Sequence, residues 1–310
     1  MLTILFSARP DRWNQYEDPL NGALDHARIG PFRVVTEAPR AEVDYIVYAP
    51  NGGLTDFSVF PNLKAVLSLW AGVETIVGNT TITVPLARMV DSGLRAGMRE
   101  WVVGHVLRHH LGMDADIMGT PGVWAPRVPP LARDRSIAIL GLGELGTACA
   151  EALSALGFRV SGWSRSPRTL PGVTCHSGAD GLATCLQQAQ IVVLLLPDTQ
   201  ATQNILNSET LARLPKGAVV INPGRGPLID DDALLAALDR GQVAHATLDV
   251  FRVEPLPADH PFWTHPGVTV TPHIASETRP DTASLVIAEN IRRCEAGQPM
   301  LHLVDRDAGY

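Results

Sequence analysis

The sequence predicts an α/β protein in which a parallel, doubly wound sheet is inserted into a second α/β domain. Three observations predict this fold. Residues 136–271 alternate apolar runs with helical stretches, which is the rhythm of a parallel sheet covered by helices. Residues 1–98 hold further short apolar runs closed by Gly and Pro, and 310 residues suit two domains of about 150 residues each. We expect one domain over residues 99–282 and another built from residues 1–98 and 283–310.

The first domain segment predicts short buried strands. Leu2–Phe6, Tyr45–Tyr48 and Ala65–Trp70 are apolar runs, and the last two lead into Gly-containing turns, as buried strands of an α/β unit do. Apolar residues at helical spacing then predict a helix over Glu100–Leu111. The Pro-rich stretch Gly119–Pro130 cannot be helical and predicts a surface connector.

Beyond this connector, predicted strands and helices alternate. In chain order we expect a strand at Ser136–Leu140, a helix ending at Leu156, strands at Arg159–Gly162, Ile191–Leu196 and Ala218–Ile221, a helix at Asp231–Leu238, strands at Ala244–Leu248 and Val268–Thr271, and a final helix at Ala283–Cys294.

Composition excludes several classes of protein. Hydrophobic residues at 45% and charged residues at 18% exclude disorder, and a net charge of −7 makes nucleic acid an unlikely main partner. No stretch reaches the roughly 20 apolar residues of a membrane span, and the N-terminus lacks the basic region of a signal peptide. The four cysteines have no Cys-x-x-Cys spacing, which favours a reducing compartment. We therefore expect a cytoplasmic protein.

A glycine motif follows the predicted strand at Ser136–Leu140 and opens a helix. In Gly141-Leu-Gly143-Glu-Leu-Gly146 the first glycine permits a tight turn, the second lets the backbone approach a pyrophosphate, and the third allows close packing of helix on strand. This context indicates a Rossmann-type dinucleotide site. We expect Gly141, Gly143 and Gly146, with the backbone N–H groups of Glu144 and Leu145, to cradle the phosphates.

The next strand predicts which dinucleotide binds. A site for NAD carries Asp or Glu about 20 residues after the first glycine, where it accepts from the ribose 2′-hydroxyl. This chain has Ser164-Arg165-Ser166 there, which offers a guanidinium and two hydroxyls for a 2′-phosphate. We expect NADP(H) to be preferred, with NAD(H) possible. The alternative interpretation is an exposed basic loop.

Three further loops follow strands of the same sheet, at the edge where open α/β folds bind ligands. They carry Arg225, Glu254 and His273. Each alone has an ordinary explanation, as a surface arginine, a turn carboxylate or a loop histidine. Together with a dinucleotide site, they supply what the reduction of a carbonyl group requires.

With these motifs the chain resembles the D-isomer-specific 2-hydroxyacid dehydrogenases, and within them the glyoxylate/hydroxypyruvate reductase A group. The motifs are the glycine fingerprint, the Asn222 to Gly226 loop, Leu248-Asp-Val-Phe with Glu254-Pro-Leu-Pro, and Thr271-Pro-His273. The resemblance covers essentially the whole chain, from the loop that begins at Ala71 to the terminal Tyr310. It implies a flavodoxin-like substrate domain and a homodimer, for which the helix from Glu100 is a candidate interface element.

The resemblance also implies roles for further residues. Backbone N–H groups of Ala71, Gly72 and Val73 are expected to hold the substrate carboxylate. The cofactor is expected to contact Leu196, Pro197, Thr202, Pro223, Gly224, Asp249 and Ala275, with Asp249 and the Ala275 backbone on the carboxamide.

The chemistry that we expect is reduction of a small 2-oxo acid, glyoxylate or hydroxypyruvate, to a D-2-hydroxy acid. Hydride transfer to C2 needs a proton for the developing alkoxide, and His273 is expected to be that acid. Glu254 would orient the imidazole and favour its protonated form. Arg225 would bind the substrate carboxylate and polarise the 2-oxo group.

Alternatives remain at this point. His105 and His109 have the spacing of a zinc pair but no Glu between them, so we expect no metal site. Asp230, Asp231 and Asp232 stand where a helix N-terminus favours carboxylates. A protein that senses NAD(P) and regulates partners, as related corepressors do, is the alternative from another class. A 2-hydroxyacid dehydrogenase for a bulkier substrate is a closer one, and phosphoglycerate dehydrogenase is disfavoured because a chain ending at Tyr310 leaves no room for its regulatory domain.

Overall fold

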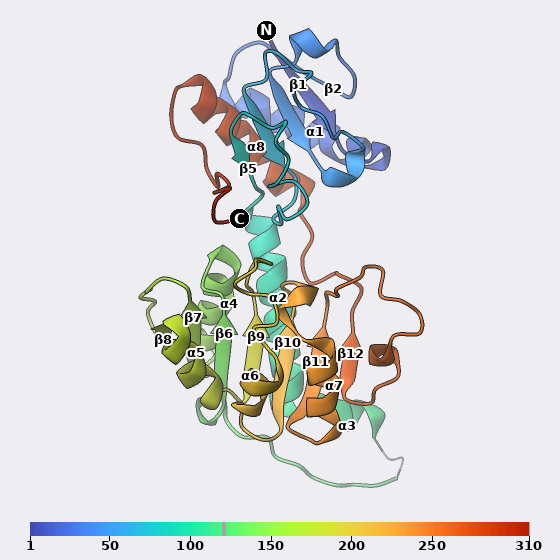
Figure 1. Ribbon diagram of the computed structural model, residues 1–310, viewed down its shortest axis with the longest axis vertical. Helices are drawn as coiled ribbons and strands as arrows, with labels where there is room; N and C mark the ends of the chain where they lie inside the picture. Colours follow the sequence, from blue (N-terminus) through green and yellow to red (C-terminus); the bar gives the residue numbers. More distant parts are fainter. Residues whose placement is uncertain (120–121, 310) are drawn as a thin grey trace. The chain divides into compact units, whose positions relative to one another are not determined.

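The computed structural model describes residues 1–119 and 122–309, and the chain divides into two compact units (Figure 1). Unit 1 contains Met1–Leu94 and Glu277–Tyr310, and unit 2 contains Arg95–Ser276. The expected domain boundaries, after residues 98 and 282, fall a few residues later in the chain. Thr120 and Pro121 of the expected connector, and the terminal Tyr310, lie outside the described residues.

The described residues of unit 2 form a seven-stranded parallel sheet in the order β12-β11-β10-β9-β6-β7-β8. The strands are β6 (Ser136–Leu140), β7 (Arg159–Ser164), β8 (Val173–Ser177), β9 (Ile191–Leu194), β10 (Ala218–Asn222), β11 (Val243–Leu248) and β12 (Val268–Val270). The chain runs outward from β6 to β8, returns to β9 beside β6, and then runs outward in the opposite direction. This reversal between β6 and β9 is the switch point at which such sheets bind dinucleotides. The predicted doubly wound parallel sheet is confirmed.

Both faces of this sheet are buried, as alternation along β6 shows. Ile137 and Ile139 belong to one hydrophobic cluster, and Ala138 and Leu140 belong to the other. The first face is covered by α2 (Ser92–Leu111) and α4 (Glu144–Ala155), and the second by α5 (Gly178–Gln187), α6 (Ser208–Ala212) and α7 (Asp231–Asp239). A short helix, α3 (Met113–Met118), follows α2. Residues that point to both faces are apolar because neither face meets water.

Unit 1 has a smaller sheet of the same kind. Its described residues form five parallel strands in the order β2-β1-β3-β4-β5, which is the flavodoxin-like order. The elements are β1 (Leu2–Ser7), α1 (Pro10–Ala27), β2 (Phe32–Val35), β3 (Tyr45–Tyr48), β4 (Ala65–Ser68), β5 (Leu86–Ala87) and α8 (Pro280–Glu295). Helices α1 and α8 pack Leu20, Leu24 and Ile287 against one face of the sheet.

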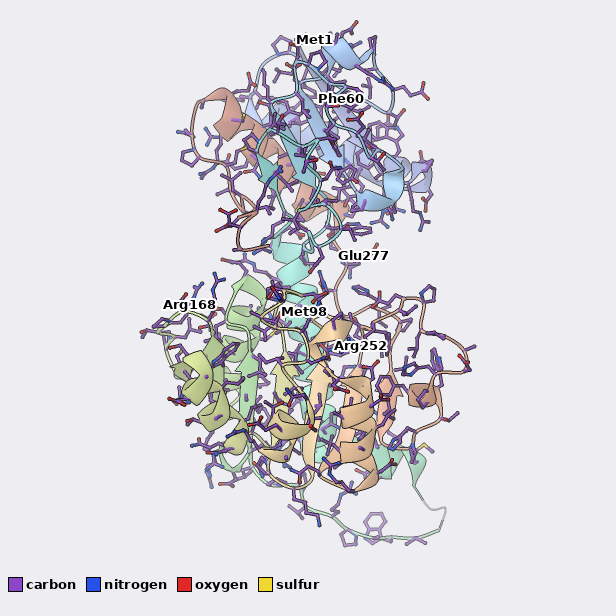
Figure 2. The ribbon with its side chains drawn as sticks, in the orientation of Figure 1. Met1, Phe60, Met98, Arg168, Arg252 and Glu277 are labelled. Carbon is purple, nitrogen blue, oxygen red and sulfur yellow. The ribbon has the colours of Figure 1, made fainter. Side chains whose placement is uncertain are left out.

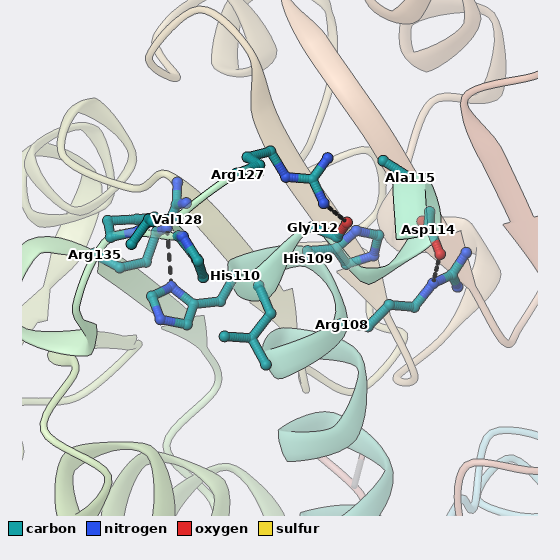
Figure 3. A pocket seen from close by; sticks show the side chains of 12 residues that line it. Arg108, His109, His110, Gly112, Asp114, Ala115, Arg127, Val128 and Arg135 are labelled. Atoms are coloured by element: carbon teal, nitrogen blue, oxygen red, sulfur yellow. Dashed lines mark hydrogen bonds and ion pairs between the residues drawn. The ribbon is translucent and has the colours of Figure 1, made fainter. Parts of the chain in front are cut away.

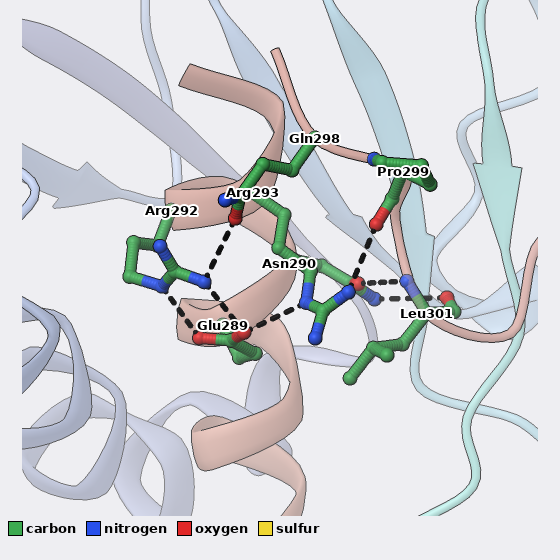
Figure 4. Close-up of polar contacts among 7 residues, drawn as sticks. All are labelled: Glu289, Asn290, Arg292, Arg293, Gln298, Pro299 and Leu301. Carbon is green, nitrogen blue, oxygen red and sulfur yellow. Dashed lines mark hydrogen bonds and ion pairs between the residues drawn. The ribbon is translucent and has the colours of Figure 1, made fainter. Parts of the chain in front are cut away.

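The turn after α8 is fixed by side chains of that helix (Figure 4). Asn290, which is buried, accepts a hydrogen bond from the Leu301 N–H at 2.7 Å and donates one to the Leu301 carbonyl at 3.3 Å. Arg292 and Arg293 both hydrogen-bond Glu289, and these bonds lower the pKa of Glu289 to about 2. These contacts hold the C-terminal segment of unit 1 against α8.

Several elements differ from the sequence expectation. Strands β2 and β8 were not expected, because both are half-exposed edge strands without a continuous apolar run. Helix α2 begins eight residues earlier than expected, at Ser92 rather than Glu100. Its first turns contain Gly93 and Gly97, which lower helix propensity. Gly97 packs closely on Ser276, because a Cβ at position 97 would lie 2.9 Å from Ser276 Oγ. Among the described residues, no helix combines the length and the apolar character needed to cross a bilayer.

Candidate active site

The glycine turn between β6 and α4 leaves room for a ligand at one of its three glycines. Gly141 has a φ of 107°, and a Cβ at this position would lie 2.4 Å from the Leu195 carbonyl oxygen. A Cβ at Gly146 would lie 1.7 Å from the Gly141 oxygen, so both positions require glycine. At Gly143, by contrast, a Cβ would meet no atom within 4 Å. Gly143 is also the N-cap of α4 and offers no side-chain acceptor, so the helix N–H groups of Glu144 and Leu145 face this open space without a side-chain cap.

An exposed basic loop follows β7. Ser164 ends the strand. Its hydroxyl donates to the Ser166 carbonyl at 2.8 Å, and this hydrogen bond closes a turn that has Arg165 at its centre. Arg165 is exposed, and so is Arg168 three residues later (Figure 2). Arg168 was not among the expected site residues, although a second cation close to Arg165 in the sequence is a signal that could have identified it. The loop contains no carboxylate.

The loop after β9 is built around a threonine. Thr202 is buried, and its hydroxyl donates to the Pro197 carbonyl at 2.7 Å and accepts from the Thr199 N–H at 2.9 Å. Leu196 is also buried. Within the same loop, the buried Asp198 Oδ1 has no hydrogen-bond partner. A buried carboxylate oxygen without a hydrogen-bond donor is costly.

The loop after β10 is shaped by Asn222, a buried residue to which the sequence analysis gave no role. Its Nδ2 donates to the Arg225 carbonyl at 2.8 Å, and its Oδ1 accepts from the Gly224 N–H at 3.1 Å. Pro223 and Gly224 are therefore buried in a fixed turn, while the Arg225 side chain is partly exposed. The asparagine amide supplies both a donor and an acceptor to this turn, which neither Asp nor Leu could do.

Glu254 and His273 form a hydrogen-bonded pair. His273 Nδ1 lies 2.7 Å from Glu254 Oε2, and the other carboxylate oxygen of Glu254 accepts from the Phe251 N–H at 2.9 Å. The structure therefore brings together two residues that are 19 positions apart in the sequence. With Nδ1 bound to the carboxylate, Nε2 is the imidazole nitrogen that remains for a substrate.

The pKa values of the pair diverge. The hydrogen bond from Glu254 raises the pKa of His273 above its ordinary value, against burial and the positive charge of Arg225, which lower it. Burial alone would raise the pKa of Glu254, but the hydrogen bonds from His273 and Phe251 outweigh it and lower the pKa. Both shifts favour an imidazolium next to a carboxylate. Arg225 is close enough to act on both groups electrostatically.

The segment that carries His273 is anchored by Asp249. This carboxylate is fully buried, and its Oδ1 accepts from the Thr271 hydroxyl at 2.6 Å and the Ile274 N–H at 2.9 Å. Its Oδ2 accepts from the Ala275 N–H at 2.8 Å, and its backbone carbonyl accepts from the His273 N–H at 2.9 Å. These contacts hold His273 at a φ of 54°, a left-handed conformation that is unfavourable for residues other than glycine. The expectation that Asp249 contacts the carboxamide directly does not fit a side chain with no exposed surface, so we assign it a positioning role.

The expected substrate loop belongs to unit 1. Ala71, Gly72 and Val73 follow β4, and the buried Val73 accepts at its carbonyl from the N–H groups of Ile76 and Val77 at 2.9 and 2.8 Å. All the other expected site residues lie in unit 2.

Comparison with known proteins identifies the family. The family model for the NAD binding domain of D-isomer specific 2-hydroxyacid dehydrogenases matches residues 104–275. The glyoxylate/hydroxypyruvate reductase A of Serratia proteamaculans (strain 568) is 43% identical over 256 residues, which cover 80% of this chain and 82% of that protein. The chain belongs to the D-isomer specific 2-hydroxyacid dehydrogenase family. The reductase A of Salmonella heidelberg (strain SL476) is 39% identical over 301 residues, 94% of each chain.

Solved structures of 2-hydroxyacid dehydrogenases share the whole fold. A D-isomer specific 2-hydroxyacid dehydrogenase from Xanthobacter autotrophicus Py2, in complex with NADPH and MES, is 40% identical with a TM-score of 0.89 over 99% of each chain. The NADPH-dependent glyoxylate/hydroxypyruvate reductase of Sinorhizobium meliloti, in complex with NADP and sulfate, is 33% identical with a TM-score of 0.86 over 100% of each chain. The predicted family, fold and enzyme class are confirmed.

The histidines of α2 serve packing in this dehydrogenase. His109 Nε2 lies 2.8 Å from the Thr247 hydroxyl, and its ring packs against His245. Burial lowers the pKa of His109 to about 3, so it is neutral at physiological pH. Among residues 1–119 and 122–309, no group of three or more His, Cys, Asp or Glu side chains is arranged to hold a metal ion.

A separate pocket of about 410 Å³ lies where α2 ends (Figure 3). Its arginines are already engaged by protein groups. Arg127 donates to the Gly112 carbonyl at 2.7 Å, Arg108 donates to Asp114 at 2.6 Å, and Arg135 Nε lies 3.5 Å from His110 Nδ1. Arg135 directly precedes β6, so this pocket is at the opposite end of the sheet from the loops that follow the strands.

Proposed function

We propose that this dehydrogenase uses NADPH to reduce small 2-oxo acids to D-2-hydroxy acids, with glyoxylate and hydroxypyruvate as the first candidates. The observation that carries the proposal is the 2.7 Å hydrogen bond between His273 and Glu254, with Arg225 acting electrostatically on both. The names of the reductase A relatives support the substrate class. The NADPH and NADP complexes of the structural relatives support the cofactor.

The residues of unit 2 fit a dinucleotide. The open space at Gly143, with the uncapped start of α4, suits a pyrophosphate. Ser164, Arg165 and Ser166 would hold a 2′-phosphate, with Arg168 as a second cation. When bound, the nicotinamide supplies the hydride.

In the proposed reaction, His273 is the general acid. Glu254 holds Nδ1, which orients Nε2 and keeps a proton on it for the substrate oxygen. Arg225 binds the substrate carboxylate as a bidentate fork, and its charge stabilises the developing alkoxide. Asn222 and Asp249 keep the two loops in place without contacting the substrate. The role of Ala71, Gly72 and Val73 stays a prediction.

Turnover tests the proposal directly. Glyoxylate, hydroxypyruvate, pyruvate and a branched 2-oxo acid would be assayed with NADPH and with NADH, and the products analysed on a chiral column. We expect the highest kcat/KM for glyoxylate or hydroxypyruvate with NADPH. Preference for the branched acid would favour the bulkier-substrate alternative, and cofactor binding without any turnover would favour a sensing protein.

Replacing Arg165 with Ala should change the choice of cofactor. One charge-assisted hydrogen bond contributes about 1.5–3 kcal/mol, so kcat/KM with NADPH should fall by about 10- to 100-fold while the value with NADH stays close to the parent. Arg168→Ala should act in the same direction. As a control, Arg133→Ala removes an exposed arginine that precedes β6 and should leave both values unchanged. An unchanged NADPH/NADH ratio in Arg165→Ala would refute the assignment.

We further propose that the chain forms a homodimer through α3 and the connector after it. The apolar residues Met98, Val102 and Val106 of α2 pack into the core of unit 2, so this face of the expected interface helix is already covered. Ile117, Met118 and Trp124 are instead exposed, Trp124 by 95%. Exposed aromatic and Met side chains are typical of protein interfaces. The free thiols of all four cysteines support a reducing compartment, the cytoplasm.

Light scattering during gel filtration tests the interface. The parent should have twice the mass of the 33.3 kDa chain, and Met118→Ser with Trp124→Ser should shift it to the mass of one chain. Leu285→Ser, which changes an exposed apolar residue of α8, is the matched control and should not shift it. A dimeric double variant would place the interface elsewhere.

A further inference from the structure

Arg252 lies in the loop after β11, two residues before Glu254, and its side chain reaches out of that loop (Figure 2). Its Nη2 donates to the Asn204 side-chain oxygen and to the Ile229 carbonyl oxygen. Its Nε lies 3.6 Å from Asp231 Oδ1. One guanidinium therefore connects the Glu254 loop to two other segments through two of its nitrogens, Nη2 and Nε.

The two segments that Arg252 binds are themselves joined to the Arg225 loop. Ile229 follows the short 3₁₀ helix Gly226–Leu228, which begins directly after Arg225. Asn204, whose φ is 51°, donates its N–H to the Pro227 carbonyl at 2.9 Å. Arg252 thus binds the chain directly after the turn that follows Arg225 and also, at Asn204, the loop that is hydrogen-bonded to this turn.

The backbones of the Arg225 and Glu254 loops also touch at one point. A Cβ at Gly226 would lie 2.0 Å from the Phe251 carbonyl carbon and 2.4 Å from the Arg252 N. The N–H of Phe251 is the group that donates to Glu254 Oε1. The peptide segment 251–252 therefore supports Glu254 and abuts the Arg225 loop at the same time, and the Arg252 side chain anchors this segment.

The charges around Arg252 stabilise the anchored geometry. Asp231 is partly buried, and burial raises its pKa while Arg252 and His260 oppose that rise. His260 Nε2 lies 3.8 Å from Asp231 Oδ2. The neighbouring carboxylates of Asp230 and Asp232 repel the Asp231 carboxylate. Without Arg252, Asp231 would lose the larger of the two positive charges that favour its ionised form.

We propose that Arg252 is a positioning residue that holds Glu254 against His273 and fixes the Glu254 loop relative to Arg225. This inference rests on the proposed function for its catalytic meaning. Its structural content, the placement of Glu254, can be tested without any turnover.

The test uses the variants Arg252→Met, Glu254→Gln and the double variant. Arg213→Met is the matched control, because Arg213 is 37% exposed like Arg252 but its side chain pairs with Glu209 of the same helix, α6. The imidazole of His273 would be titrated by NMR in each full-length protein, with the resonance assigned from its loss in His273→Gln. A thermal melt of each variant would record any general loss of stability.

We expect the Arg252→Met titration to move to lower pH in the same direction as Glu254→Gln but by less. A shift of about half a unit would lower the protonated fraction, and hence kcat/KM on the basic limb, about threefold. In the Glu254→Gln background, Arg252→Met should add no further shift, because its effect passes through Glu254. The control should titrate like the parent.

An unchanged His273 titration in Arg252→Met, or an additive shift in the double variant, would overturn the inference even if the melting temperature fell. Because the titration does not require turnover, a parent that titrates as expected but reduces no 2-oxo acid would refute the proposed function and leave the positioning role supported.

Discussion

Replacing His273 with Gln should lower kcat for glyoxylate reduction by about 10²- to 10⁴-fold, the contribution of a positioned general acid. Glutamine keeps a hydrogen-bonding group near Glu254 Oε2, but it cannot carry the proton that the developing alkoxide needs. The KM for NADPH should stay close to the parent, because the turn at Gly143, which we propose to bind the phosphates, belongs to another loop. NADPH oxidation measured by absorbance, with matched thermal melts, gives both numbers.

The Glu254→Gln variant separates the acid from its partner. Because the hydrogen bond from Glu254 raises the pKa of His273, the protonated acid persists to higher pH than in a free imidazole. The rate of reduction should therefore fall as pH rises through this raised pKa. In Glu254→Gln the pKa returns toward about 6.5, so the falling limb moves to lower pH while activity at acidic pH is largely kept. A His273→Gln enzyme with near-parent kcat, or superimposable pH profiles for Glu254→Gln and parent, would contradict this mechanism.

The parts of the fold that could be predicted are those whose residues are buried on both sides. Strand β6 could be predicted because Ile137 to Leu140 are all apolar, and β9 could be predicted for the same reason. Strand β8, with an exposed Thr174 and a partly exposed His176, offers no such run, and its place at the sheet edge is decided by tertiary pairing with β7. The start of α2 was missed because Gly93 and Gly97 lower helix propensity locally, although Gly97 packs closely on Ser276 in the folded chain.

Some residues of the candidate site could likewise be predicted from the sequence, and others could not. Arg225, Glu254 and His273 could be proposed because catalytic chemistry limits which residue types follow the strands, and the structure shows the Glu254–His273 contact. Their catalytic roles stay a prediction. The residues that support them could not, because their function depends on contacts rather than type. Nothing in the sequence around Arg252 shows that its guanidinium hydrogen-bonds to the Ile229 carbonyl. From the sequence alone, Asp249 fits a ligand-contacting residue equally well, and only the structure shows that its side chain is buried.

Asp249→Asn should cost about 1–3 kcal/mol of the free energy of unfolding, although the side chain keeps its size. The carboxylate accepts three hydrogen bonds with two oxygens, while an amide has one oxygen and an NH₂ group. The NH₂ must then face the N–H of Ile274 or that of Ala275, so one buried backbone donor loses its acceptor, at that cost. The Thr271 hydroxyl can rotate to accept instead, but an N–H cannot. Chemical denaturation followed by tryptophan fluorescence measures the loss.

The loss of kcat in Asp249→Asn should be larger than the loss of folded protein alone would cause. The 273–275 segment would move to relieve the donor clash, and a displacement of about 1 Å at the acid costs about 10²-fold in rate. Asp305→Asn is the matched control, because Asp305 also accepts from two backbone N–H groups, those of Asp307 and Ala308, but is exposed, so water can replace what the amide loses. If Asp249 instead bound the cofactor directly, Asp249→Asn would also raise the KM for NADPH. A fall in kcat and in the free energy of unfolding, with an unchanged KM for NADPH, would support the positioning role of Asp249. In that role its three hydrogen bonds stabilise the left-handed backbone conformation of His273.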